Sequence, residues 1–168
     1  MKLNELFLGQ LDNEAKSTRR VLERVLEGRN DWKPHEKSMA FGYLAALVAK
    51  MPSWIAMMVD RDAYELASKD PRFQPVDVKS NRELLQVFDE AVAAGRRALE
   101  NASDEHLVKN WKFLVNGHVA SESPRYVAIR DTMFSHWAHH RGQLTVYLRL
   151  NEALVPAIYG PSADDRGF

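Results

Sequence analysis

The chain has no cysteine among its 168 residues. This absence excludes disulfide bonds, metal sites built from thiolates and a cysteine nucleophile. A bound metal ion would therefore have to be held by histidine nitrogens, carboxylate oxygens or water.

An excess of charge of either sign is also missing. The chain has 23 Lys and Arg residues against 23 Asp and Glu residues, so its formal net charge at pH 7 is zero. A protein without an overall positive field has no general attraction for nucleic acid or for an anionic membrane surface. We therefore expect neither as a partner.

Long hydrophobic runs are absent as well. The N-terminal stretch MKLNELFLGQLDNEAK lacks the apolar run of a signal peptide, and the longest charge-free run, residues 38–49, is too short to span a bilayer. These features predict a cytoplasmic protein. Hydrophobic residues make up 45% of the chain and charged residues 27%, as in soluble globular proteins. The length is that of one domain, which we expect to cover residues 1–168.

Apolar residues recur at helical spacing in four long segments, and these predict an all-α four-helix bundle. The first helix should cover residues 3–27 and end at Gly28. The second should cover residues 38–60 with a kink at Pro52, which has no amide hydrogen to donate. The third should begin at a capping box, Ser80-Asn81-Arg82-Glu83, and reach residue 100. The fourth should cover residues 124–150, with Pro124 at its first position.

Two connections are distinctive. Residues 61–79 are long and contain Pro71 and Pro75, which predicts a crossover between the second and third helices. Asn116-Gly117 lies between two short alternating runs, the strongest short-range signal for a β-hairpin. We expect this small hairpin, near residues 111–121 and just before the fourth helix, to contain the only strands.

Two histidines on the fourth helix are the candidate site. His136 and His140 are four residues apart, so they lie one above the other on the helix face that also carries Ile129, Met133 and Leu144. Two imidazoles in this arrangement can converge on one metal ion. Burial disfavours the protonated rings, and a neutral ring is the form that accepts a metal ion or a hydrogen bond.

The structural alternative is a pair of buried histidines that are hydrogen-bonded to a carboxylate, a hydroxyl or a carbonyl group, because the HxxxH spacing alone is a weak signal. His139 points about 100° away from the pair and is a poor ligand for the same ion. His35 and His118 are interpreted as surface residues. A carboxylate di-metal bundle would need an ExxH motif that the expected helices lack, and there is no HExxH motif to supply a general base.

Two stretches of the chain resemble DinB-like proteins, which are damage-inducible metal-binding four-helix bundles. One is His136-Trp-Ala-His-His-Arg-Gly-Gln-Leu-Thr-Val-Tyr-Leu-Arg149 followed by Val155-Pro-Ala-Ile-Tyr-Gly-Pro-Ser162. The other is Met39-Ala-Phe-Gly-Tyr-Leu-Ala-Ala-Leu-Val-Ala-Lys-Met-Pro-Ser-Trp54, which is similar to the second helix of that family. Together with the helices around them, these stretches extend the resemblance over nearly the whole chain.

The resemblance implies a divalent metal ion, zinc or nickel, held by one histidine of the second helix and two of the fourth. The two histidines of the fourth helix correspond to His136 and His140, but the position on the second helix is occupied by Leu47, which cannot bind a metal. Because this third ligand is missing, we expect metal binding to be weak or absent. The implied function is a metal-dependent enzyme similar to thiol-dependent transferases and isomerases, or one with hydrolase-like activity, with a low-molecular-weight thiol as substrate and a degenerate metal site. The alternative is a non-catalytic, metal-free stress-response or binding bundle.

A homodimer is also expected. The family commonly forms pairs, the zero net charge removes a source of repulsion between copies, and Gly142 on the outer face of the fourth helix permits close approach of another helix.

Overall fold

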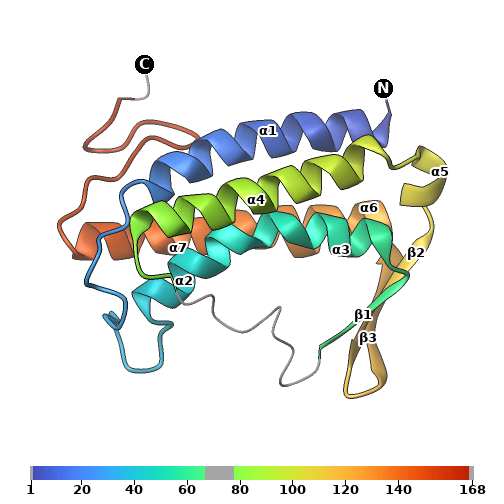
Figure 1. Cartoon of the computed structure of the whole chain (residues 1–168), viewed down its shortest axis with the longest axis horizontal. Helices are drawn as coiled ribbons and strands as arrows, with labels where there is room; N and C mark the ends of the chain where they lie inside the picture. The colour runs from blue at the N-terminus through green and yellow to red at the C-terminus, as the bar shows by residue number, and fades with distance from the viewer. Residues whose placement is uncertain (1, 67–77, 167–168) are drawn as a thin grey trace.

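The computed structural model describes residues 2–66 and 78–166. Within these ranges the chain is mostly helical and contains one small three-stranded sheet. The long helices lie side by side and the sheet projects from one end (Figure 1). These helices are α1 (Leu3–Leu22), α2 (Phe41–Lys50), α3 (Trp54–Asp60), α4 (Asn81–Glu100) and α7 (His136–Leu150).

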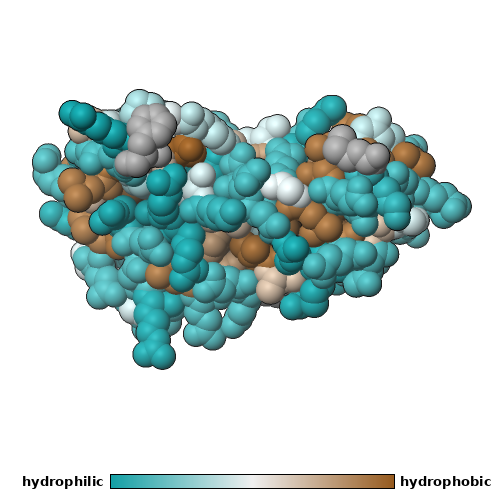
Figure 2. Space-filling view, turned by 90° about the horizontal axis from the view of Figure 1, so that it is seen from above, coloured by the Kyte–Doolittle hydropathy of each residue, from teal (hydrophilic) through white to brown (hydrophobic). Residues whose placement is uncertain are grey.

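Helices α1 and α4 pack against each other and bury apolar stripes at helical spacing. Their outer surfaces, seen from above in Figure 2, are mostly hydrophilic, with apolar side chains in separate patches. The capping box of α4 is partly confirmed, because Ser80 Oγ accepts from the Glu83 amide, whereas the Glu83 carboxylate accepts from the Lys79 amide. The buried residues are Phe7, Leu11, Thr18, Val21 and Leu22 of α1 and Leu84, Phe88, Ala91, Gly95, Ala98 and Leu99 of α4.

Helix α1 ends five residues earlier than the sequence predicts. The side-chain amide of Asn81 donates to the carbonyl oxygens of Leu22 at 2.8 Å and Val25 at 3.3 Å. These contacts supply side-chain donors to carbonyl groups at the end of the helix, where intrahelical partners run out. A contact between residues so distant in sequence cannot be found from local spacing.

The predicted second helix is interrupted at Pro52. Helix α2 is followed by a 3₁₀ turn, η1 (Met51–Ser53), and then by α3, so the expected kink is confirmed as a break. The helix begins after Ala40 rather than at the predicted Ser38 cap. The segment Phe41–Asp60 is long and apolar enough to span a membrane by composition, but 56% of its most apolar window is buried inside the protein. Its apolar side chains thus form part of the core, as in a helix of a soluble domain.

Gly95 of α4 contacts the break at Pro52. A Cβ atom at position 95 would lie 2.6 Å from the carbonyl oxygen of Pro52, closer than a carbon can approach a backbone oxygen without a shift of the helices. We expect Gly95→Ala to lower the free energy of unfolding by about 1–3 kcal/mol. Gly9→Ala is the matched control, because a Cβ atom there meets nothing within 4 Å and should stabilise α1 by up to about 1 kcal/mol. Urea denaturation of both variants checks this, and a Gly95→Ala protein as stable as the Gly9→Ala protein would refute the close packing.

The sheet consists of β1 (Ala63–Leu66), β2 (Asn110–Val115) and β3 (His118–Pro124), in that order. The predicted hairpin is confirmed as β2 and β3, whose turn has positive φ angles at Asn116 (51°) and Gly117 (77°), as a two-residue hairpin turn requires. The expectation of strands in the hairpin alone was wrong, since β1 pairs in parallel with β2. This strand lies in the predicted crossover, of which residues 67–77 lie outside the described residues.

The predicted fourth helix has three parts. A helical turn, α6 (Arg125–Ala128), leads into a seven-residue π-helical segment, η2 (Ile129–Ser135), and α7 begins at His136. Pro124 caps α6 instead of occupying its first position. Long π-helical segments are rare and often adjoin functional sites. The short helix α5 (Asp104–Leu107) is capped by Ser103, whose hydroxyl oxygen accepts from the His106 amide.

Candidate functional site

The two histidines predicted as ligands lie together at the start of α7. His140 is buried, with 5% of its surface exposed, and His136 is partly buried. Their Nε2 atoms are 2.8 Å apart and their ring centroids 4.5 Å apart. The structure thus brings the predicted pair together with the same nitrogen of each ring directed at the other.

Burial shifts the protonation of this pair. Removal from water lowers the pKa of His136 below its ordinary value, and the neighbouring His140 and His139 rings lower it further. Burial also lowers the pKa of His140, partly offset by a hydrogen bond to Gln143. Both rings are therefore neutral near pH 7, and neutral imidazoles have lone pairs for a metal ion or a hydrogen bond.

Further residues contact the pair. The indole ring of Trp54 on α3 lies against His136 with centroids 5.8 Å apart. The side-chain oxygen of Gln143 is 2.8 Å from His140 Nδ1. The backbone of Thr132, in the π-helical segment, raises the pKa of His136 and so partly offsets the effect of burial. None of these three residues was predicted from the sequence, although Gln143, three positions after His140, shares its side of the helix.

The position of Leu47 follows from contacts between α2 and α7. Trp137 Nε1 donates to the carbonyl of Val48 at 2.8 Å, and the hydroxyl of Tyr147 donates to the carbonyl of Met39 at 3.2 Å. These contacts fix the two helices as antiparallel neighbours, with Leu47 close to the level of His136 and His140. Leu47 is partly buried and packs on the apolar core.

Across residues 2–66 and 78–166, no group of three or more His, Asp or Glu side chains is arranged to hold a metal ion. The two histidines can still supply two ligands to one ion, because their Nε2 atoms lie only 2.8 Å apart. Two nitrogens bound tetrahedrally to zinc lie about 3.4 Å apart, so the rings would have to separate by about half an ångström.

The other histidines are not part of this site. His139 is exposed on α7, and its ring centroid lies 5.0 Å from that of His140. His35 and His118 are exposed, as expected. His106 at the end of α5 bonds through Nε2 to the carbonyl of Val59 at 2.7 Å.

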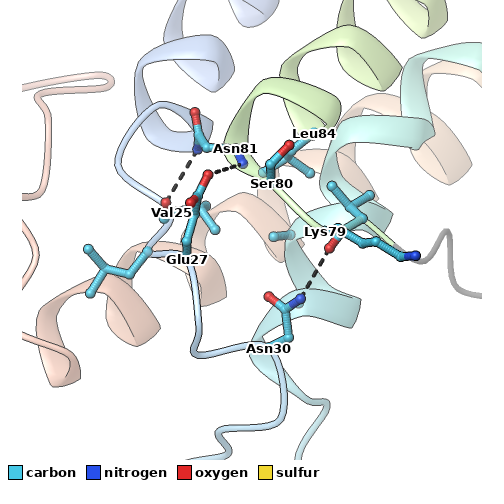
Figure 3. Close-up of a pocket in the computed structure, with 11 residues that line it drawn as sticks. Val25, Glu27, Asn30, Lys79, Ser80, Asn81 and Leu84 are labelled. Carbon is cyan, nitrogen blue, oxygen red and sulfur yellow. Dashed lines mark hydrogen bonds between the residues drawn. The ribbon is translucent and has the colours of Figure 1, made fainter.

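A small hollow, apart from the histidine pair, lies where the loop after α1 meets the starts of α2 and α4 (Figure 3). Its volume is about 20 Å³, room for a single water molecule. The polar groups around it are already paired, since the Asn81 amide donates to Glu27 and the Asn30 side chain donates to the carbonyl of Val78. These hydrogen bonds hold the loop close to α4, and the hollow is too small for a substrate.

No protein-family model matches the chain, and no curated protein matches it in sequence. Solved structures do share this architecture of long helices with a small sheet. A DinB-like protein from Bacillus cereus matches with a TM-score of 0.72 and 22% identity, covering 92% of this chain and 97% of that one. A DinB-like protein from Bacillus subtilis matches with a TM-score of 0.65 and 18% identity, covering 95% of this chain and 97% of that one.

The chain therefore has the fold of DinB-like proteins, which confirms the resemblance seen in residues 39–54 and 136–162 at the level of the fold. At identities below 25% this similarity establishes no activity, so the chemistry depends on the site itself.

Proposed function

We propose that this protein binds one divalent metal ion, zinc or nickel, through Nε2 of His136 and Nε2 of His140. The observation that carries this proposal is the convergence of the two nitrogens, 2.8 Å apart on a partly buried face of α7. Two neutral imidazoles with lone pairs directed at one point form a donor set suited to these metals. With Leu47 on the facing helix, the remaining positions would be filled by water or substrate.

The proposed activity is that of a metal-dependent enzyme acting on a low-molecular-weight thiol, by analogy with the activities associated with DinB-like bundles. A bound divalent ion lowers the pKa of a coordinated thiol or water and so produces a nucleophile near neutral pH. The protein's own residues would hold the two nitrogens in place, and Trp54 against His136 would limit access of water on one side. We place this activity in the cytoplasm, in a four-helix bundle with a crossover between α3 and α4.

A metal-free binding bundle is the second candidate. A distance of 2.8 Å also fits a hydrogen bond between a protonated and an unprotonated ring nitrogen. In that case the pair would be a structural element of the core, and the protein would have no metal-dependent activity.

Calorimetric titration with zinc at pH 7.5 separates the two candidates. The proposal predicts one site per chain, a loss of affinity of at least tenfold in His136→Ala and in His140→Ala, and no change in the His139→Ala control. If the unmodified protein takes up no zinc at millimolar concentration, the metal-dependent function is refuted and the metal-free bundle is favoured.

We further propose that the protein is a homodimer formed through the outer face of α7. Val146 and Leu150 are each more than half exposed there, as is Leu154 just after the helix, and a Cβ atom on Gly142 would meet nothing within 4 Å. Apolar side chains beside an uncovered helix glycine allow a second helix to approach closely. Light scattering at micromolar concentration should give the mass of two chains, whereas the mass of one chain would rule out this dimer.

A further inference from the structure

The ring of His140 makes two specific contacts, one with each nitrogen. Nδ1 lies 2.8 Å from Oε1 of Gln143, and Nε2 lies 2.8 Å from Nε2 of His136. An amide oxygen can only accept a hydrogen bond, so the nitrogen that faces it must carry the proton. In a neutral ring the other nitrogen, Nε2, then has the lone pair and points it at His136.

From these contacts we infer that Gln143 is a positioning residue: its side-chain oxygen fixes His140 in the orientation with the proton on Nδ1 and so directs the Nε2 lone pair to the metal position. This inference rests on the metal-binding function proposed above and explains how His140 is prepared for an ion without a third ligand on α2. Partners of this kind, which hold the second nitrogen of a ligating histidine, commonly change metal affinity by about 10- to 100-fold.

Three variants test the role of Gln143. Gln143→Leu removes the acceptor from an exposed side chain and should leave the fold intact, while Gln143→Glu keeps an oxygen acceptor. Gln86→Leu is the matched control, because Gln86 is also an exposed helical glutamine whose amide bonds to a side chain four residues away, Glu90 of α4. Circular dichroism checks that all three remain folded.

Two measurements are made on each variant. Zinc titration should show affinity at least tenfold weaker in Gln143→Leu, equal or tighter affinity in Gln143→Glu, and no change in Gln86→Leu. Nitrogen-15 NMR of the metal-free protein, which distinguishes the two neutral forms of each ring, should show the proton of His140 on Nδ1 in the unmodified protein. In Gln143→Leu this proton should move in part to Nε2.

The outcomes separate this inference from the proposed function. Zinc affinity unchanged in Gln143→Leu would overturn the positioning role while leaving the metal site in place. A His140 proton on Nε2 in the unmodified protein would overturn it as well, whatever the zinc result. If neither the unmodified protein nor any variant binds zinc, the metal-binding function is refuted. A His140 proton on Nδ1 that depends on Gln143 would then show that Gln143 orients His140 within a structural, metal-free histidine pair.

Discussion

Leu47→His should raise the affinity for zinc by tenfold or more, equivalent to about 1.4 kcal/mol. Leu47 lies close to the level of His136 and His140 on the neighbouring antiparallel helix, as the contacts of Val48 and Met39 with α7 show. An imidazole at this position would add a third nitrogen ligand and remove an apolar side chain that disfavours charge and displaces water. Competition with a zinc chelator at pH 7.5 measures the gain.

The gain must depend on the original pair. Adding His140→Ala to Leu47→His should remove it, because the new imidazole would then have too few partners. Affinity should also fall as the pH drops through about 6.5, where free imidazoles protonate and compete with the metal ion. A Leu47→His protein with unchanged affinity at pH 7.5 would mean that position 47 does not face the histidines or that the pair is structural.

Arg125→Met should lower the free energy of unfolding by about 3–5 kcal/mol, because several buried carbonyl groups would lose a donor. The Arg125 side chain is almost fully buried and pairs with Asp62, and it also donates to four backbone carbonyl groups. Methionine fills the space but removes the side-chain donor from these oxygens, of which only that of Lys109 still accepts from the backbone amide of residue 125, and a buried polar group without a partner is costly. The four acceptors belong to Met58, Arg61, Lys109 and Asn110.

Arg130→Met is the control for this prediction. Arg130 also pairs with an aspartate, Asp131, at 2.7 Å, but both side chains are more than half exposed. Exposed ion pairs contribute roughly 0–1 kcal/mol, so this variant should unfold at nearly the same urea concentration as the unmodified protein. Equal losses in the two variants would show that Arg125 does not join α3 to the sheet as described.

Features that depend on local spacing could be predicted from the sequence. The start of α4 at Ser80, the hairpin turn at Asn116-Gly117 and the placement of His136 and His140 on one inner face all follow from residues within a few positions of one another. In each case, side chains and backbone groups that meet in the structure are already neighbours in the chain.

Features that depend on distant contacts could not be predicted in this way. Strand β1 pairs with β2 across a long sequence separation, and its four residues show no clear alternation. From its position in the sequence, Arg125 resembles an ordinary surface residue at the start of a helix. In the structure, four carbonyl groups from other segments surround its side chain. The π-helical segment before His136 has no sequence signature comparable to a capping box, so it became apparent only from the structure.

The central claim is that His136 and His140 bind one metal ion through Nε2. X-ray absorption at the zinc edge, on protein loaded with one equivalent of zinc, tests it most directly. The account predicts two imidazole nitrogens at about 2.0–2.1 Å from zinc, with oxygen atoms in the remaining positions. Their scattering should disappear in the His136→Ala, His140→Ala double variant and persist in His139→Ala. A spectrum without imidazole scattering, or one that the double variant leaves unchanged, would contradict the account.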